Sequence, residues 1–386
     1  MAASDEDVTA HRILWELDAS VSSSVNKTRK FVDEFKRNLE QDFPRINSVI
    51  KVSLTHGGSA YEGLAVSENA DFDITVLLGD PFKLENFHVE RDQKSDFFTL
   101  RWKSHLKNKI LCNRDYYLKA ADLREKMLTD LHTTIDNMYL ASVKKIDIKH
   151  WLTSLAVEIH LLSGSKISID VVPQVAFRSW NQCPDLKQIS ELSRHQRQYI
   201  DKINKNKSPV MCFALAVPDK ENYSRGDFLF NISFSLLEKE FFKANTEIRD
   251  MVRLVKFVAD RRGWKEKPLK FKSYYAKRVA IKYDKQLKTK NLWDGFRALL
   301  RFLRSDLDEI GTIDGFYVGN QVTYRKDRSV LDKFIREIDS VLYMSAKEVK
   351  DLLNGNVYDF GSRALSPEEA TFTTEGAEST YSCIII

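Results

Sequence analysis

The stretch DFDITVLL, Asp71–Leu78, decides how the chain is interpreted. Its apolar residues predict a short buried strand. Residues two apart in a strand project from the same face, so Asp71 and Asp73 point together while the apolar side chains between them pack behind. Two carboxylates on one face repel each other unless a cation lies between them. A hard, oxygen-seeking ion such as Mg²⁺ fits that demand.

A third acid stands in the apolar stretch KISIDVV, residues 166–172. Strand alternation turns Asp170 away from the face taken by its isoleucine and valine neighbours. If this strand pairs beside Asp73, three carboxylates meet. They can then hold two metal ions that activate an attacking hydroxyl and stabilise a departing pyrophosphate.

Upstream of these acids lies the glycine turn GGSAYE, residues 57–62. Glycine lets the backbone approach a ligand closely, so we expect Gly58 and Ser59 to bring N–H groups and a hydroxyl to a triphosphate. A DxD pair alone is commonly a chance pair of solvated acids. Together with the glycine turn and the third aspartate, it favours a catalytic site. No Walker A, GxGxxG or HExxH motif competes.

Composition narrows the class of protein. The chain has 386 residues, 43% hydrophobic and 30% charged, enough for a sizeable core in two lobes. It has no apolar run of the ~18–20 residues that cross a bilayer, and its acidic start lacks a signal-peptide core, so we expect a cytoplasmic protein. No cysteine or histidine spacing is typical of a zinc site, so we expect metal held by carboxylates and no zinc. The scattered cysteines are Cys112, Cys183, Cys212 and Cys383.

The apolar periodicity predicts an α/β lobe followed by a helical lobe. We expect a long N-terminal spine helix or a broken pair over 10–43, ended by Pro44, and a helix over 115–143. Strands are predicted at 49–54, 72–78, 155–162 and 166–172, the last ended by Pro173, in a mixed sheet. Later helices are predicted at 233–243, 246–262, 273–283, 292–305 and 329–344. The predicted divisions are 1–200 for the catalytic lobe, 201–353 for the helical lobe and 354–386 for a disordered tail.

The chain resembles a known family at several places in the right order. GSAYE (58–62) followed by DFD (71–73) resembles the signature of cyclic GMP-AMP synthase, the animal cGAS-like receptors and the male-abnormal proteins. NISFSLLEKE (231–240), MVRLVKF (251–257) and KFKSYYAK (270–277) resemble later segments of that family. The likeness spans roughly residues 20–345.

The resemblance implies a bilobal nucleotidyltransferase that makes a cyclic dinucleotide from ATP and/or GTP in innate immunity. It implies that Asp71, Asp73 and Asp170 are catalytic and bind Mg²⁺ or Mn²⁺. It also implies a nucleotide-binding set in which Ser59 touches the donor triphosphate, Tyr274 stacks on a base, and Ser235 and Glu238 line the acceptor side. The full set is Gly58, Ser59, Ser235, Glu238, Lys256, Ser273, Tyr274 and Lys277. Tyrosine beside lysine suits a purine nucleotide.

The sequence departs from the family twice. Cyclic GMP-AMP synthase has a zinc-binding insertion between the helices that correspond to 233–243 and 252–262, where this chain has only residues 244–250. A zinc-dependent grip on double-stranded DNA is therefore less expected than binding of double-stranded RNA, because the family members without the insertion include receptors for double-stranded RNA. Asn231 stands where the family has a base-reading arginine, and asparagine cannot supply a bidentate cationic fork. The bases joined and their linkage stay open.

Positive charge gathers between residues 261 and 290, which hold twelve Lys or Arg and two acids, although the whole chain carries only +5. Such a patch favours polyanions, whereas the alternative is a solvated helix face. A-form RNA is bound largely through phosphates and 2′-hydroxyls, so we expect it to activate the enzyme by ordering the active site. The expected nucleic-acid contacts are Lys27, Lys30, Lys36, Arg261, Arg262 and Lys265.

The sequence ends in SCIII, residues 382–386, which matches a prenylation box at Cys383. A lipid there would allow peripheral membrane association, although one chain anchors only marginally. The alternative is a plain apolar terminus. Two other functions also stay open: a linear oligonucleotide synthase, and a non-catalytic nucleotide- or RNA-binding scaffold.

Overall fold

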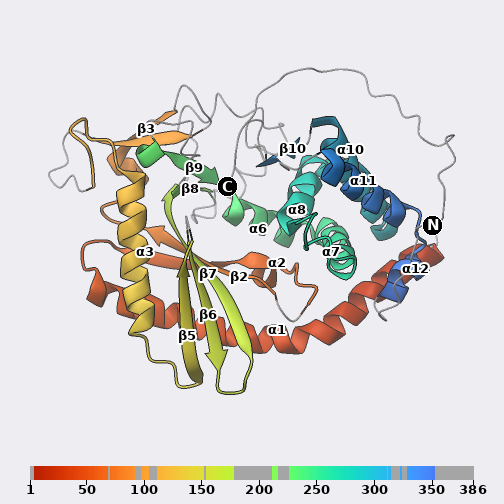
Figure 1. Ribbon diagram of the computed structural model, residues 1–386, viewed down its shortest axis with the longest axis horizontal. Coiled ribbons are helices and arrows are strands. Elements are labelled where there is room, and N and C mark those ends of the chain that lie inside the picture. The colour runs from red at the N-terminus through yellow and green to blue at the C-terminus, as the bar shows by residue number, and fades with distance from the viewer. Residues whose placement is uncertain are drawn as a thin grey trace.

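The computed structural model describes residues 4–67, 70–91, 97–103, 111–151, 154–177, 211–215, 226–310, 312–313, 322–323 and 328–352. A half built on a β-sheet and a half built from helices lie side by side, and helix α1 runs beneath both (Figure 1). The fold class expected from the sequence, a mixed sheet followed by helices, is confirmed. None of the helices described is both long and apolar enough to cross a bilayer.

Helix α1, Asp5–Ile46, is a single helix of 42 residues rather than a broken pair. Ser4 caps it by accepting a hydrogen bond from the backbone of Asp7. The prediction that Pro44 ends the helix was wrong. Pro44 lies within the last turn, where its ring removes only one N–H group, and the helix closes two residues later with Asn47 N donating to Phe43 O.

The strands described form one mixed sheet. Its order is β1 (Val52–Gly57), β2 (Phe72–Leu78), β7 (Lys166–Phe177), β8 (Met211–Leu215), β9 (Phe230–Ser233), β4 (Phe98–Trp102) and β3 (Phe87–Arg91). β6 (Leu155–Leu161) also pairs with β7, and β5 (Val143–His150) pairs with β6. β2 and β7 run parallel, and the other neighbours run antiparallel.

Strand β7 shows where the sequence pattern misleads. The prediction that Pro173 ends the strand was wrong, because β7 continues to Phe177. Among the described residues, β6 pairs with β7 as far as Val171 and β8 pairs from Gln174 onward. Pro173 therefore lies where the neighbour changes, and a missing N–H group is tolerated there.

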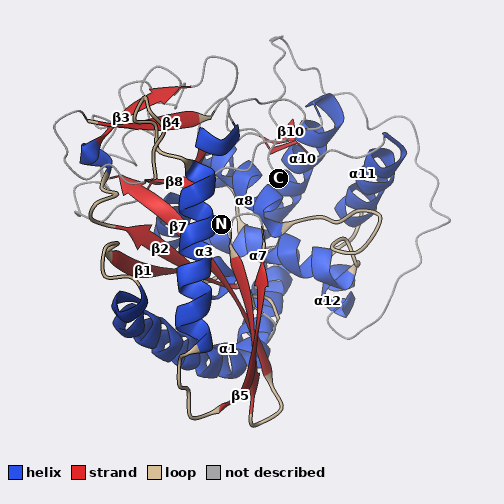
Figure 2. Ribbon diagram, turned by 60° about the vertical axis from the view of Figure 1, so that its left-hand side comes forward, coloured by secondary structure: helices blue, strands red, loops and turns tan. Residues whose placement is uncertain are grey.

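Helix α3, Ala120–Asp136, lies across one face of the sheet and contacts β5, β7 and β8 (Figure 1, Figure 2). It begins later than predicted because residues just before it form bridges to earlier segments, such as Tyr117 with Arg101. The short helices η1 (Leu84–Asn86) and η3 (Gly226–Phe228) connect parts of this half.

The helices of the second half begin with Ser235, directly after strands β8 and β9 of the sheet. Helix α10 packs against α7, α8 and α11. Asn245 alone separates α6 from α7 and caps both. The elements are α6 (Ser235–Ala244), α7 (Thr246–Arg261), α8 (Ser273–Lys282), α9 (Asp284–Leu287), α10 (Leu292–Ile310), β10 (Thr312–Ile313), β11 (Val322–Thr323), α11 (Arg328–Leu342) and α12 (Ala346–Asp351).

Candidate active site

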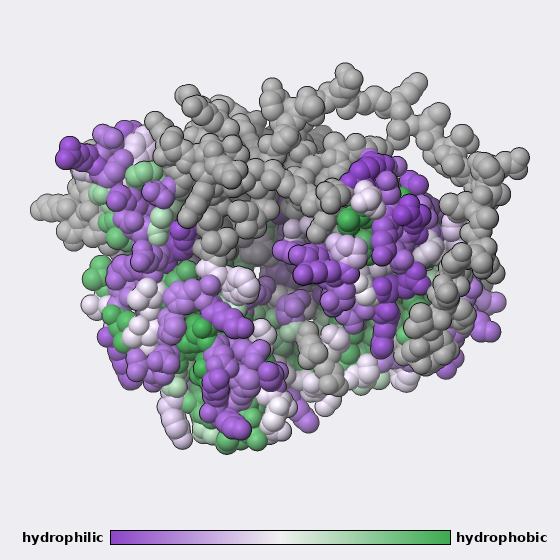
Figure 3. Space-filling view, in the orientation of Figure 1, coloured by the Kyte–Doolittle hydropathy of each residue, from purple (hydrophilic) through white to green (hydrophobic). Residues whose placement is uncertain are grey.

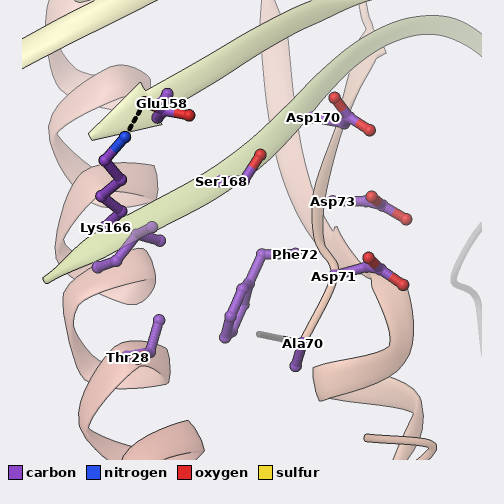
Figure 4. Close-up of a pocket in the computed structure, with 10 residues that line it drawn as sticks. Thr28, Ala70, Asp71, Phe72, Asp73, Glu158, Lys166, Ser168 and Asp170 are labelled. Atoms are coloured by element: carbon purple, nitrogen blue, oxygen red, sulfur yellow. Dashed lines mark hydrogen bonds and ion pairs between the residues drawn. The ribbon is translucent and has the colours of Figure 1, made fainter. Parts of the chain in front are cut away.

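Three aspartates come together at the centre of the sheet. Asp73 on β2 lies directly opposite Asp170 on the parallel strand β7, so the predicted pairing of these strands is confirmed. Asp71 comes just before β2. All three line a cavity of about 220 Å³, and their carboxyl groups point the same way in Figure 4. Since β2 is parallel to β7, equal positions along the two strands present their side chains side by side.

The charges of these acids are poorly compensated by the protein. Desolvation, followed by the charges of Asp170 and Glu62, raises the pKa of Asp73 to about 7, although Lys277 opposes the shift. Desolvation and the charge of Asp71 raise the pKa of Asp170 above its ordinary value. A cluster that resists ionisation in this way is stabilised by a divalent cation.

The donor set fits Mg²⁺ or Mn²⁺, because three carboxylates offer only oxygen ligands. In the described residues, one group of acids and histidines has a ligand atom from each member within 4.8 Å of the others. That group lies on β5 and β6 and includes none of the three aspartates. The three aspartates are therefore spread more widely, as repelling carboxylates are. Asp71, Asp73 and Asp170 are the residues that would hold a divalent ion in this cavity.

The glycine turn is packed against Asp71. It forms the short helix α2, Gly58–Glu62, directly after β1. Gly58 has φ +80°, and a Cβ there would lie 2.5 Å from the backbone oxygen of Asp71, so no other residue fits without strain. The hydroxyl of Ser59 is buried and accepts a 3.1 Å hydrogen bond from the backbone N–H of Asp71. The turn therefore fixes the position of the first aspartate.

Lys277 joins the helical half to the glycine turn. Its Nζ lies 2.9 Å from Glu62 on α2 and 3.6 Å from Glu238 on α6. All three side chains are largely buried. Burial disfavours the charged form of Lys277, but Glu62 and Glu238 outweigh it and raise the pKa of the lysine. Glu62 is a residue that the sequence reasoning missed, since its burial cannot be read from the GSAYE motif.

Lys256 on α7 is buried, and desolvation lowers the pKa of its ammonium to about 8. The charge of Asp71 is the largest influence that favours its protonated form. Within the described part of the chain, no carboxylate lies within ion-pair distance of Lys256. A desolvated ammonium of this kind gains from an anion that enters the site.

The other expected nucleotide-binding residues begin helices of the second half. Ser235 is the first residue of α6, and its exposed hydroxyl lies 3.1 Å from that of Ser233. Ser273 is the first residue of α8, and Tyr274 follows it with its ring 4.5 Å from that of Tyr275. Burial raises the pKa of Tyr274. The surface is hollowed between the two halves of the molecule (Figure 3).

The residues expected to contact nucleic acid differ in whether their side chains already form ion pairs within the protein. Lys27 and Lys30 are exposed on α1, and Arg261 is exposed at the end of α7 beside the ring of Phe257. The other three form ion pairs within the protein: Lys36 with Glu40 at 3.3 Å, Arg262 with Glu337 at 2.8 Å, and Lys265 with Asp260 at 2.8 Å. The side chain of Asn231 and the residue Cys383 lie outside the described residues.

The cavity extends beyond the aspartates to residues that the sequence reasoning did not select. Its far end is lined by Thr28 on α1, Ser168 and Lys166 on β7, and Glu158 on β6 (Figure 4). Lys166 Nζ lies 3.1 Å from Glu158 Oε1. Strand alternation could have identified Ser168 and Lys166, because they share the face of Asp170.

Comparison with known protein families finds one similarity that covers the three aspartates. Residues 60–244 match the model of the Mab-21 protein nucleotidyltransferase domain. No curated protein gives a significant match to the chain. The matched segment contains all three aspartates and ends with α6, before the helices that carry Lys256 and Lys277. This part of the chain, a little under half of it, is therefore similar to a nucleotidyltransferase domain of the Mab-21 type.

Proposed function

We propose that this protein makes a cyclic dinucleotide second messenger from ATP and/or GTP in innate immune signalling, and that double-stranded RNA activates it. The observation that carries the proposal is the placing of Asp73 opposite Asp170, with Asp71 beside them, in a cavity of a nucleotidyltransferase domain. A non-catalytic scaffold has no need of three clustered acids, one of which has a pKa raised to about 7.

The chain's own residues account for binding of the donor. Asp71, Asp73 and Asp170 would hold the metal, which would supply activation of the attacking hydroxyl and neutralise charge on the leaving pyrophosphate. The turn at Gly58 and Ser59 keeps Asp71 in place and brings backbone N–H groups to the triphosphate. Lys256 donates to a phosphate oxygen, and the phosphate restores the charged form that burial disfavours.

The helical half forms the acceptor side in this proposal. Lys277 is held between Glu62 and Glu238, so it orients the start of α6 rather than offering a free charge. Ser235 then presents its hydroxyl to the acceptor nucleotide, and Tyr274 offers a ring for a base to stack on. The linear product turns over in the same site and is closed by a second transfer.

Contacts of α1 support activation by RNA. Arg29 donates to the backbone oxygen of Ala60 in α2, and Tyr61 donates a 2.7 Å hydrogen bond to Asp33. The exposed Lys27 and Lys30 lie within one turn of these contacts, so a ligand on this helix can reposition the catalytic turn. Only Asn245 separates α6 from α7, and this short connection supports the choice of RNA over DNA in the proposal.

One incubation tests the proposal: the full chain with Mg²⁺ and all four nucleoside triphosphates, with and without double-stranded RNA or DNA. Chromatography and mass spectrometry should identify a cyclic dinucleotide that depends on RNA. A linear oligonucleotide would contradict the cyclic product. Equal synthesis without nucleic acid would contradict activation, and no synthesis under any condition would favour the scaffold.

We also propose a cytoplasmic protein that associates peripherally with membranes through prenylation of Cys383. The proposal rests on the terminal SCIII sequence. The intact mass of protein from animal cells should carry an isoprenoid, and Cys383→Ser should release the protein from the membrane fraction. An unmodified mass, or membrane association that persists in the variant, would contradict it.

A further inference from the structure

A second cluster of ligand side chains lies on the hairpin of β5 and β6. Asp147 on β5 is the cross-strand partner of Glu158 on β6, and His160 lies two residues further along β6. All three side chains therefore project from the same face of the sheet. One ligand atom from each lies within 4.8 Å of the others. None of the three aspartates of the candidate active site belongs to this group.

The distances within the cluster resemble those of a coordination shell. His160 Nε2 lies 3.0 Å from Asp147 Oδ2 and 2.9 Å from Glu158 Oε1. Ligand atoms about 2.1 Å from an ion and at right angles to each other are separated by about 3 Å. His160 Nε2 is also shut off from solvent. Its nitrogen thus faces two carboxylate oxygens at the spacing that a shared cation requires.

We infer that Asp147, Glu158 and His160 bind a divalent transition-metal ion, at a site separate from the three catalytic aspartates. One imidazole nitrogen with two carboxylate oxygens suits Zn²⁺, Co²⁺ or Mn²⁺ better than Mg²⁺, which prefers oxygen ligands alone. Three protein ligands leave further positions for water. The ion links β5 to β6 across the hairpin, and the inference goes beyond the proposed nucleotide transfer.

Two lysines compete with the ion. Lys145 Nζ lies 2.6 Å from Asp147 Oδ1, and Lys166 Nζ lies 3.1 Å from Glu158 Oε1, the oxygen that also faces His160. Metal binding therefore displaces Lys166 from Glu158. Lys166 and Glu158 both line the cavity of the candidate active site (Figure 4). Removing either lysine should strengthen metal binding.

Titration with Co²⁺ tests the site, because bound Co²⁺ gives visible absorption. The full chain carrying Asp71→Asn, Asp73→Asn and Asp170→Asn is used, so that the catalytic site contributes nothing and the outcome does not depend on enzymatic activity. We expect one saturable equivalent of Co²⁺, displaced by Zn²⁺. In this background, His160→Ala and Glu158→Gln should each weaken binding at least tenfold, and Lys145→Met should strengthen it.

His132→Ala is the matched control. His132 Nδ1 lies 2.7 Å from His150 Nε2, so this pair of close histidines is a second place that could attract a metal. The control should bind Co²⁺ as the parent does. Absence of saturable absorption, or its loss in His132→Ala instead of His160→Ala, would overturn the inference. Circular dichroism of each variant checks that the fold is retained.

Discussion

Two acidic clusters on the same sheet differ in the direction in which their surroundings shift the pKa values of their carboxyl groups. At Asp73 and Asp170, desolvation and neighbouring acids raise the pKa values. At Asp147 and Glu158, hydrogen bonds and charges from Lys145 and Lys166 lower them. The residue types are the same, so the surroundings decide the chemistry. The first cluster is short of positive charge, whereas lysines already supply it to the second.

The largest difference in stability is expected between two variants that each lose a lysine acting on one of the clusters, Lys277 for Asp73 and Lys145 for Asp147. Lys277→Met leaves Glu62 and Glu238 buried without their cation, and breaking such a pair costs about 3–5 kcal/mol. Lys145→Met removes a partner of an exposed pair and should change the free energy of unfolding little. Urea unfolding measures both.

A second substitution distinguishes the effect of unbalanced charge in Lys277→Met from the effect of lost packing. Adding Glu62→Gln to Lys277→Met should recover part of the stability, because one uncompensated charge is removed. Equal losses in Lys277→Met and Lys145→Met would contradict the contrast between buried and exposed clusters.

Neutralising an acid should have opposite signs in the two clusters. Above pH 7 the metal-free protein holds Asp73 in a charged form that folding disfavours, so Asp73→Asn should stabilise it by on the order of 1–4 kcal/mol. The gain should shrink as the pH falls from 7 towards 4, because Asp73 is then neutral in the folded protein. Thermal unfolding in a chelator at pH 8 and pH 5 measures it.

Asp147→Asn is the counterpart, because its pKa is lowered and its charge favours folding at neutral pH. This variant should be slightly less stable than the parent at pH 7, and the difference should vanish in acid as the pH falls through the lowered pKa. A destabilised Asp73→Asn at pH 8 would show that the charge of Asp73 is compensated after all.

Replacing a glycine beside each cluster compares how much room the surrounding backbone leaves for a side chain. Gly58→Ala should destabilise the protein by about 1–3 kcal/mol and lower synthesis, because its φ is +80° and its Cβ meets the backbone of Asp71. Gly164 follows β6 with φ +85°, but no atom lies within 4 Å of its Cβ position. Gly164→Ala therefore carries only the backbone strain. Equal effects would show that the contact with Asp71 is unimportant.

Metal affinity should depend on pH at the first cluster. With the pKa of Asp73 at about 7, Mg²⁺ must displace a proton below that pH, so affinity should fall about tenfold from pH 8 to pH 6. Calorimetry in two buffers of different ionisation enthalpy also measures the proton released. An affinity independent of pH, with no proton release, would place the metal elsewhere.

The first cluster was predictable and the second was not. Asp73 and Asp170 lie on strands whose two-residue alternation can be read directly, Asp71 comes just before the first of them, and the bounds of β2 matched the prediction. Asp147, Glu158 and His160 meet only through the register of β5 against β6, which linear spacing does not reveal. The ion pair of Lys277 with Glu62 likewise depends on how the two halves pack together. Pro173 fits within β7 because the neighbouring strand changes there, which the sequence pattern does not show.

The most direct test compares products from the unaltered chain, Asp73→Asn and the matched control Asp147→Asn, each given Mg²⁺, labelled ATP and GTP, and double-stranded RNA. We expect a cyclic dinucleotide from the unaltered chain and from Asp147→Asn, and a loss on the order of a thousandfold in Asp73→Asn. Undiminished synthesis by Asp73→Asn would contradict the assignment of the three aspartates as the catalytic metal site.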